Sequence, residues 1–101
     1  MNARAREALA KIRQCVATDR YLVLKHFVRR MDQRCLFWPD VQAVLNSPSA
    51  MEDAGTDKLN RPKWIVTGKA TDGYELEIVC ILDVDAQGDV AVFMTAYWGE
   101  D

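Results

Sequence analysis

Hydrophobic residues divide the chain into a helical first half and an extended second half. Apolar side chains recur at helical spacing in residues 3–17, 25–33 and 39–46, which predicts three helices. Pro39 suits the first turn of the third helix, where its missing N–H is not needed. Residues 21–24 are apolar and β-prone, and two interpretations stay open for them: a short strand, or the lead into the second helix.

After residue 62 the pattern changes to the two-residue alternation typical of strands. Two turn sequences, Thr71-Asp72-Gly73 and Ala86-Gln87-Gly88-Asp89, separate three extended segments. These segments are residues 64–69, 75–83 and 90–98. Because tight turns join consecutive strands, the sequence predicts an antiparallel meander.

The segment between the two halves is polar and irregular. Residues 49–62 contain Gly55 and Pro62, so we expect a loop there. At most, this loop should hold one short strand near Met51. The whole pattern predicts the α+β class, with N-terminal helices packed on a three- or four-stranded antiparallel sheet. One domain should span residues 1–101.

The last predicted strand carries aromatic and hydroxyl side chains. Phe93, Thr95 and Tyr97 lie two residues apart, so we expect them on one face. Phe93 is a typical core residue. Because Thr95 and Tyr97 should share its face, that face is expected to be packed. Tyr97 therefore suits a core position as well as a functional one.

The net charge of −2 conceals two halves of opposite sign. Residues 1–38 contain nine Lys and Arg against three Asp and Glu, a balance of +6, and residues 39–101 contain four against twelve, a balance of −8. If the N-terminal helices form one surface, that surface could attract phosphates. In the alternative, the two halves neutralise each other across the fold.

Several classes of protein are disfavoured. No apolar run approaches the roughly 18 residues that span a bilayer, and the charged N-terminus lacks the apolar core of a secretory signal, so we expect a cytoplasmic protein. Cys15, Cys35 and Cys80 form no CxxC pair and accompany a single histidine. We therefore expect buried, unpaired thiols, no metal site and no cofactor.

A histidine and spaced arginines open the second predicted helix, as His26-Phe-Val-Arg-Arg30-Met-Asp-Gln-Arg34. Further along come Val41-Gln-Ala-Val44-Leu45, a strand ending in Gly68, the turn Asp72-Gly73, and Thr95-Ala96-Tyr97. Over residues 21–98 this order resembles the domain-of-unknown-function family 4258, with the helix of residues 1–18 lying outside the resemblance. Cys35 stands where that family has glycine, so the chain need not turn as sharply there.

The resemblance implies a fold related to the RelE-like and BrnT-like toxins, with a barnase-like plan of helices followed by an antiparallel sheet. Those toxins are small ribonucleases of bacterial toxin–antitoxin pairs. The resemblance therefore implies RNA as a substrate and an antitoxin protein as a partner.

The histidine and two of the arginines suit RNA cleavage. His26, Arg30 and Arg34 are spaced by four residues, so a helix carries them along one face. The imidazole can move a proton, and the guanidiniums can hold a phosphate. With Tyr97 as a proton donor or stacking ring, these four form the predicted catalytic site. In the alternative, His26 hydrogen-bonds a loop carbonyl and the arginines pair with the acidic half. Candidate carboxylates are Glu75, Glu77 and Asp83.

Other residues are predicted to bind nucleic acid around this site. They are Arg29, Arg61, Lys63 and Thr95. Trp64, beside Lys63, could stack on a base, and a core position is its alternative.

The leading hypothesis is a metal-independent, ribonuclease-like toxin fold acting on single-stranded RNA. The alternatives are a non-catalytic binding module for protein or nucleic acid, antitoxin-like or regulatory, and an uncharacterised structural domain. Expected partners are RNA, a cognate antitoxin and a second copy of the chain; no membrane is expected. The stripe Ala5, Leu9, Ile12 and Val16 should either pack on the sheet or form that homodimer contact. The pI of about 5.3 counts against the leading hypothesis, because RNA-cleaving proteins tend to be basic.

Overall fold

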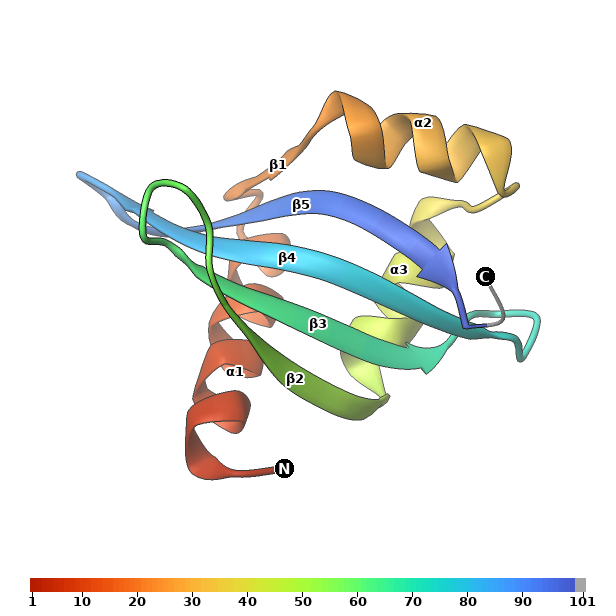
Figure 1. Ribbon diagram of the computed structural model, residues 1–101, viewed down its shortest axis with the longest axis horizontal. Helices are drawn as coiled ribbons and strands as arrows, with labels where there is room; N and C mark the ends of the chain where they lie inside the picture. Colours follow the sequence, from red (N-terminus) through yellow and green to blue (C-terminus); the bar gives the residue numbers. More distant parts are fainter. Residues whose placement is uncertain (100–101) are drawn as a thin grey trace.

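The computed structural model describes residues 1–99, which form three helices and one five-stranded sheet (Figure 1). In chain order the elements are α1 (Ala3–Ala17), β1 (Tyr21–Val23), α2 (Lys25–Gln33), α3 (Trp38–Asn46), β2 (Pro48–Thr56), β3 (Pro62–Lys69), β4 (Glu75–Asp85) and β5 (Gly88–Trp98). The predicted α+β class is confirmed. The prediction of three or four antiparallel strands is wrong, because β1, which is parallel to its neighbour, and β2 add a strand at each edge. None of the helices in residues 1–99 is long and apolar enough to cross a bilayer.

The strands lie in the order β1-β5-β4-β3-β2. The predicted antiparallel meander is confirmed as β3, β4 and β5. Both interpretations of residues 21–24 are correct. The segment forms the short strand β1, which pairs in parallel with β5, and it leads directly into α2.

The loop predicted for residues 49–62 is wrong over most of its length. Nine residues form β2, which pairs antiparallel with β3 at the far edge of the sheet. Only one side chain in three along β2 is even half-buried. An edge strand so exposed carries no alternation of apolar and polar residues, and this is why the sequence pattern did not reveal it.

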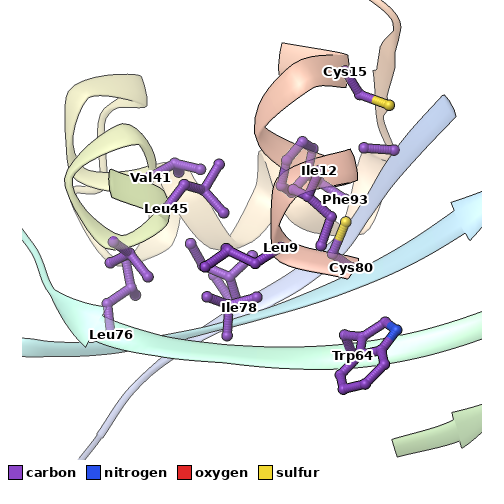
Figure 2. Packing of buried hydrophobic residues seen from close by; sticks show 14 of the residues in the cluster. Leu9, Ile12, Cys15, Val41, Leu45, Trp64, Leu76, Ile78, Cys80 and Phe93 are labelled. Carbon is purple, nitrogen blue, oxygen red and sulfur yellow. The ribbon is translucent and has the colours of Figure 1, made fainter. Parts of the chain in front are cut away.

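The core lies between helices α1 and α3 and one face of the sheet (Figure 2). Its fully buried side chains come from the three helices and from β3, β4 and β5. They include Ile12, Phe27, Val41, Val44, Val66, Leu76, Ile78, Cys80 and Phe93. The apolar stripe of α1 packs on the sheet, which is one of the two roles predicted for it. Its buried residues include Ala5, Leu9 and Ile12. The homodimer contact stays a prediction.

An aromatic cluster joins β1, α2 and α3 to β5. Phe93 contacts Phe27 with ring centroids 5.6 Å apart and meets the rings of Tyr21 and Trp38 edge to face. Tyr21 and Trp38 stack on each other at 5.0 Å. Such aromatic pairs add about 0.5–1.5 kcal/mol each beyond the area they bury. One side chain of β5 therefore positions three elements.

Helix α2 ends in a left-handed turn at Cys35. Its φ of 54° lies in the region that favours glycine, and the N–H of Leu36 donates to the carbonyl of Met31 at 2.8 Å, closing the helix end. The expectation of a gentler turn here is wrong. Cys35 is also exposed, in contrast to the buried Cys15 and Cys80, so the prediction of three buried thiols fails at this position. Burial raises the pKa of the Cys80 thiol.

Asp40 connects the start of α3 to the β3–β4 turn. It is 6% exposed, and its carboxylate accepts hydrogen bonds from the N–H of Phe37 at 2.9 Å and from the N–H and hydroxyl of Thr71 at 3.0 and 2.6 Å. Burial opposes ionisation, but these donors outweigh it and lower the pKa of Asp40 below its ordinary value of 3.8.

Cys35→Gly should stabilise the protein by about 1 kcal/mol, because a residue with a Cβ in the left-handed region costs about 1–2 kcal/mol. Thermal unfolding should show a rise in Tm of about 4–8 °C for a domain of this size. Cys35→Ala is the matched control, since it removes the thiol and keeps the Cβ. An equal rise in Tm for Cys35→Ala would show that loss of the thiol causes the stabilisation, and would contradict the explanation by backbone strain.

Asp40→Asn should reduce the free energy of unfolding at neutral pH by about 1 kcal/mol, the usual loss for a helix cap. A lowered folded-state pKa means that the ionised Asp40 stabilises the fold above about pH 4 and loses this effect as pH falls through the folded-state pKa. The difference between wild type and variant should therefore vanish in acid denaturation series. Asp32→Asn, at an exposed acid on α2, is the control. A difference for Asp40→Asn that persists unchanged at pH 2 would contradict the assignment.

Candidate functional site

The predicted site lies where α2 runs beside the outer edge of β5 (Figure 1). The edge strand β1 pairs with β5 only over residues 91–93, and the last bond of this edge runs from the N–H of Leu24 to the carbonyl of Phe93. Beyond that point α2 takes the place of a strand, anchored by Phe27 on Phe93. The C-terminal half of β5 therefore has a helix, instead of a paired strand, along its outer edge.

A β-bulge at Met94 reverses the faces of β5. Phe93 pairs with Cys80 and Thr95 pairs with Val79, so Met94 is an extra residue. Phe93 consequently lies in the core, while Thr95 and Tyr97 lie on the opposite face of the sheet from it. The expectation that these three side chains share one face is wrong, because a strand's two-residue period holds only while its register is unbroken.

The side chain of Arg30 on α2 contacts the side chain of Tyr97 on β5. The guanidinium carbon of Arg30 lies 5.8 Å from the centre of the Tyr97 ring, within the range of a cation–π contact. The Arg30 Nε is buried and has no hydrogen-bond partner in the described chain. The ring contact therefore leaves the hydrogen-bonding capacity of this Nε unused within the described chain.

Thr95 lies two residues before Tyr97 on the same face. It is 8% exposed, and its Oγ1 is the other buried side-chain polar atom without a partner in residues 1–99. A buried hydroxyl left unpaired costs about 1–3 kcal/mol. Both orphaned polar atoms of the described chain therefore belong to predicted site residues, and they flank one tyrosine. Buried polar groups of this kind call for a partner from outside the described chain, such as a water molecule or a ligand.

His26 and Arg34 extend the site along α2 in opposite directions. His26 is exposed, one turn before Arg30, and makes no hydrogen bond or ion pair with the described residues, so the alternative of a bond to a loop carbonyl is not observed. Arg34 is half-buried at the C-terminal end of the helix, one turn after Arg30. His26 and Arg30 therefore lie on α2 and Arg34 at its C-terminal cap, and the catalytic role of the three stays a prediction.

The remaining predicted nucleic-acid contacts are dispersed. Arg29 lies on the outward side of α2, in a shallow depression that it shares with Val28 and Asp32. Arg61 forms ion pairs with Asp57 at 2.6 Å and Asp83 at 3.0 Å, and its hydrogen bonds lower the pKa of Asp57. These two arginines therefore do not converge on Tyr97.

Lys63 lies on the same face of the sheet as Tyr97, but at a distance along it. This face, opposite the one that α1 and α3 cover, is called the open face below (Figure 1). Lys63 pairs with Ile81 of β4, whereas Tyr97 pairs with Glu77. Four residues along a strand correspond to about 13 Å. Trp64 points to the other face, is buried in the core, and has the guanidinium of Arg4 5.6 Å from its ring centre. Its core alternative is the one observed.

Glu77 is the neighbour of this site that sequence reasoning placed in another role. It is the cross-strand partner of Tyr97, on the same open face, and it is half-buried. In the sequence it figured as a possible counter-ion for the arginines. No sequence signal singles it out, because its juxtaposition with Tyr97 depends on the register beyond the bulge.

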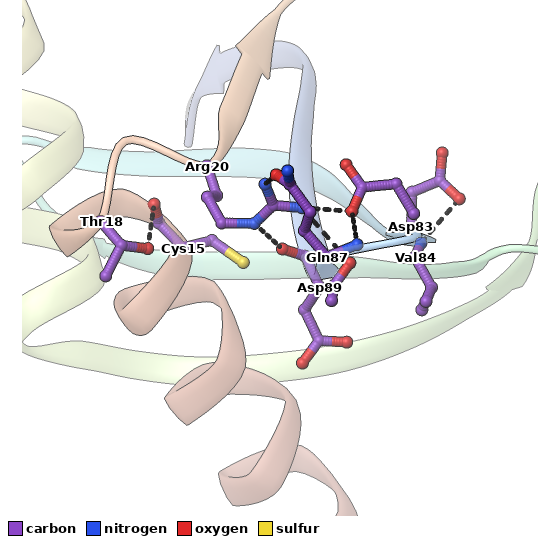
Figure 3. A network of polar contacts seen from close by, with 9 residues as sticks. Cys15, Thr18, Arg20, Asp83, Val84, Gln87 and Asp89 are labelled. Atoms are coloured by element: carbon purple, nitrogen blue, oxygen red, sulfur yellow. Dashed lines mark hydrogen bonds and ion pairs between the residues drawn. The ribbon is translucent and has the colours of Figure 1, made fainter.

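A second polar cluster holds the β4–β5 turn (Figure 3). Arg20 donates to the carboxylate of Asp85, to the side chain of Gln87 at 3.1 Å and to the carbonyl of Asp89 at 3.2 Å. The pKa of Asp85 is lowered by the hydrogen bond from Arg20. Since its donors and acceptors satisfy one another, this cluster has a structural role. No group of three or more His, Cys, Asp or Glu within residues 1–99 is arranged to hold a metal ion.

Comparison with known proteins identifies one family. No curated protein and no solved structure matches the chain. The family model described as "Domain of unknown function (DUF4258)" matches residues 23–98, which takes in α2, α3 and the four strands that follow. Helix α1 precedes the matched region. Because the match covers well over half of the chain and includes the whole candidate site, this protein belongs to the DUF4258 family.

Proposed function

We propose that this protein binds single-stranded RNA on the open face of its sheet and cleaves it without a metal ion, as a ribonuclease-like member of its family. The observation that carries the proposal is the Arg30 guanidinium lying over the Tyr97 ring. The orphaned Nε of Arg30 and Oγ1 of Thr95 beside that ring supply donors for an RNA ligand.

The residues suit attack by the ribose 2′-oxygen on the adjacent phosphorus. Arg30 holds the phosphate and stabilises the charge that gathers on its oxygens. The Tyr97 hydroxyl gives a proton to the departing 5′-oxygen. Arg34 and His26, one turn away on either side of Arg30, extend the site along the strand of RNA. A proton acceptor for the 2′-hydroxyl is also required, and His26 is the sequence-based candidate.

A binding module without catalysis is the second candidate. Apolar side chains are exposed along β1 and α2: Leu22 is 57%, Leu24 38% and Val28 52% exposed. Lys25 and Arg29 lie beside them. This combination suits an acidic protein partner such as a cognate antitoxin, whose apolar residues would cover the patch.

Arg30→Ala should weaken binding of a single-stranded RNA oligonucleotide by about 1.5–3 kcal/mol, the range for a charge-assisted hydrogen bond. Arg29→Ala is the matched control, because it removes the same charge from the outward side of the same helix. Binding of the wild type should weaken steeply with added salt, since phosphate contacts release counterions. Equal losses in the two variants would show a general charge effect and contradict a site at Arg30.

Tyr97→Phe should lower the cleavage rate by about 10²–10⁴-fold, the range for losing a general acid, and leave RNA binding intact because the ring remains. The assay measures formation of 2′,3′-cyclic phosphate ends, with the 2′-deoxy oligonucleotide as an uncleavable control. A wild type that binds RNA and cleaves none would favour the binding module. A wild type that neither binds nor cleaves RNA would overturn the nucleic-acid proposal.

A further inference from the structure

Glu77 lies directly across from Tyr97 on the open face of the sheet. The register of β3, β4 and β5 places Thr67, Glu77 and Tyr97 in one row across three strands. Residues directly opposite in an antiparallel pair have Cβ atoms about 4.5–5.5 Å apart. Arg30 covers the Tyr97 ring. A carboxylate, a phenol and a guanidinium thus follow one another along a single row and its flanking helix.

Among the acidic residues of β4, Glu77 differs from those near the other end of the strand. Asp83 is paired with Arg61, and Asp85 is paired with Arg20. Glu77 is half-buried, yet its carboxylate makes no hydrogen bond or ion pair with any residue in 1–99. A carboxylate without a cationic partner keeps its lone pairs free to accept a proton.

We propose that Glu77 is the general base of the RNA cleavage, an inference that rests on the proposed function. Its carboxylate takes the proton of the ribose 2′-hydroxyl as the 2′-oxygen forms a bond to phosphorus. The bond from phosphorus to the 5′-oxygen breaks, and that oxygen receives the proton of the Tyr97 hydroxyl. The products are a 2′,3′-cyclic phosphate and a 5′-hydroxyl, with Glu77 protonated and Tyr97 deprotonated until they exchange protons with water.

The geometry favours Glu77 over His26 for this role. A general base must lie within hydrogen-bond reach of the proton that it removes, and acid and base must flank one phosphate. Glu77 is the immediate neighbour of Tyr97, whereas His26 is exposed on α2, a full turn before the arginine that contacts the tyrosine. His26 therefore binds the RNA at the edge of the site and is not essential to proton transfer.

The test compares single-turnover cleavage and binding of one RNA oligonucleotide by the wild type, Glu77→Gln, Glu77→Asp and His26→Ala. Glu77→Gln keeps the shape of the side chain and removes the base, so cleavage should fall by about 10²–10⁴-fold while binding is kept or strengthened. Glu77→Asp should recover part of the rate. Glu52→Gln is the charge control, because Glu52 lies on the same face at the strand β2 edge. Melting curves of every variant check that the fold is retained.

The outcomes separate this inference from the function on which it rests. If the wild type cleaves RNA and Glu77→Gln cleaves it equally well, the base is another residue and the inference is overturned, while the proposed function stands. A large loss of rate in His26→Ala with none in Glu77→Gln would assign the base to His26. If the wild type binds RNA without cleaving it, the catalytic proposal and this inference fail together.

Discussion

The structure depends on the packing of Phe93 and on the bulge that follows it. The Phe93 ring contacts side chains from β1, α2 and α3, so the position of all three elements relative to the sheet is set by one core residue. Without an extra residue at Met94, the strand's alternation would carry Thr95 and Tyr97 into the same core. The bulge separates the two roles of β5: one half holds the core together, and the other presents polar groups on the open face.

Ion pairs neutralise some of the basic side chains and leave others without a counter-ion among the described residues. Arg4 pairs with Asp53 and Arg20 with Asp85, so the positive first half and the negative second half neutralise each other in part, as one sequence-based alternative held. On α2, Arg29 and Arg30 form no ion pair with the described residues. Positive charge without a counter-ion among the described residues therefore remains on the helix that borders the Tyr97 site, despite the acidic composition of the whole chain.

The family match and the core have different boundaries. DUF4258 similarity begins at residue 23, yet Leu9 and Ile12 of α1 are buried in the same cluster as Leu76 and Ile78. Helix α1 thus covers apolar surface of the sheet that is formed within the matched region. The residues of the candidate site, from His26 to Tyr97, all lie inside the matched region.

Local patterns in the sequence determined the helices, the meander and the α+β class, because burial imposes a period of 3.6 or 2 residues on any element with one apolar face. They also placed His26 and Arg30 on one helix, with Arg34 at its C-terminal end. Edge strand β2 escaped detection because its side chains are mostly exposed. The tertiary structure alone decided that Arg30 meets Tyr97 and that Glu77 faces it, since both contacts depend on a register shift that leaves no trace in residue periodicity. The left-handed turn at Cys35 was hidden for a related reason: packing of the helix end imposes a conformation that the residue itself does not prefer.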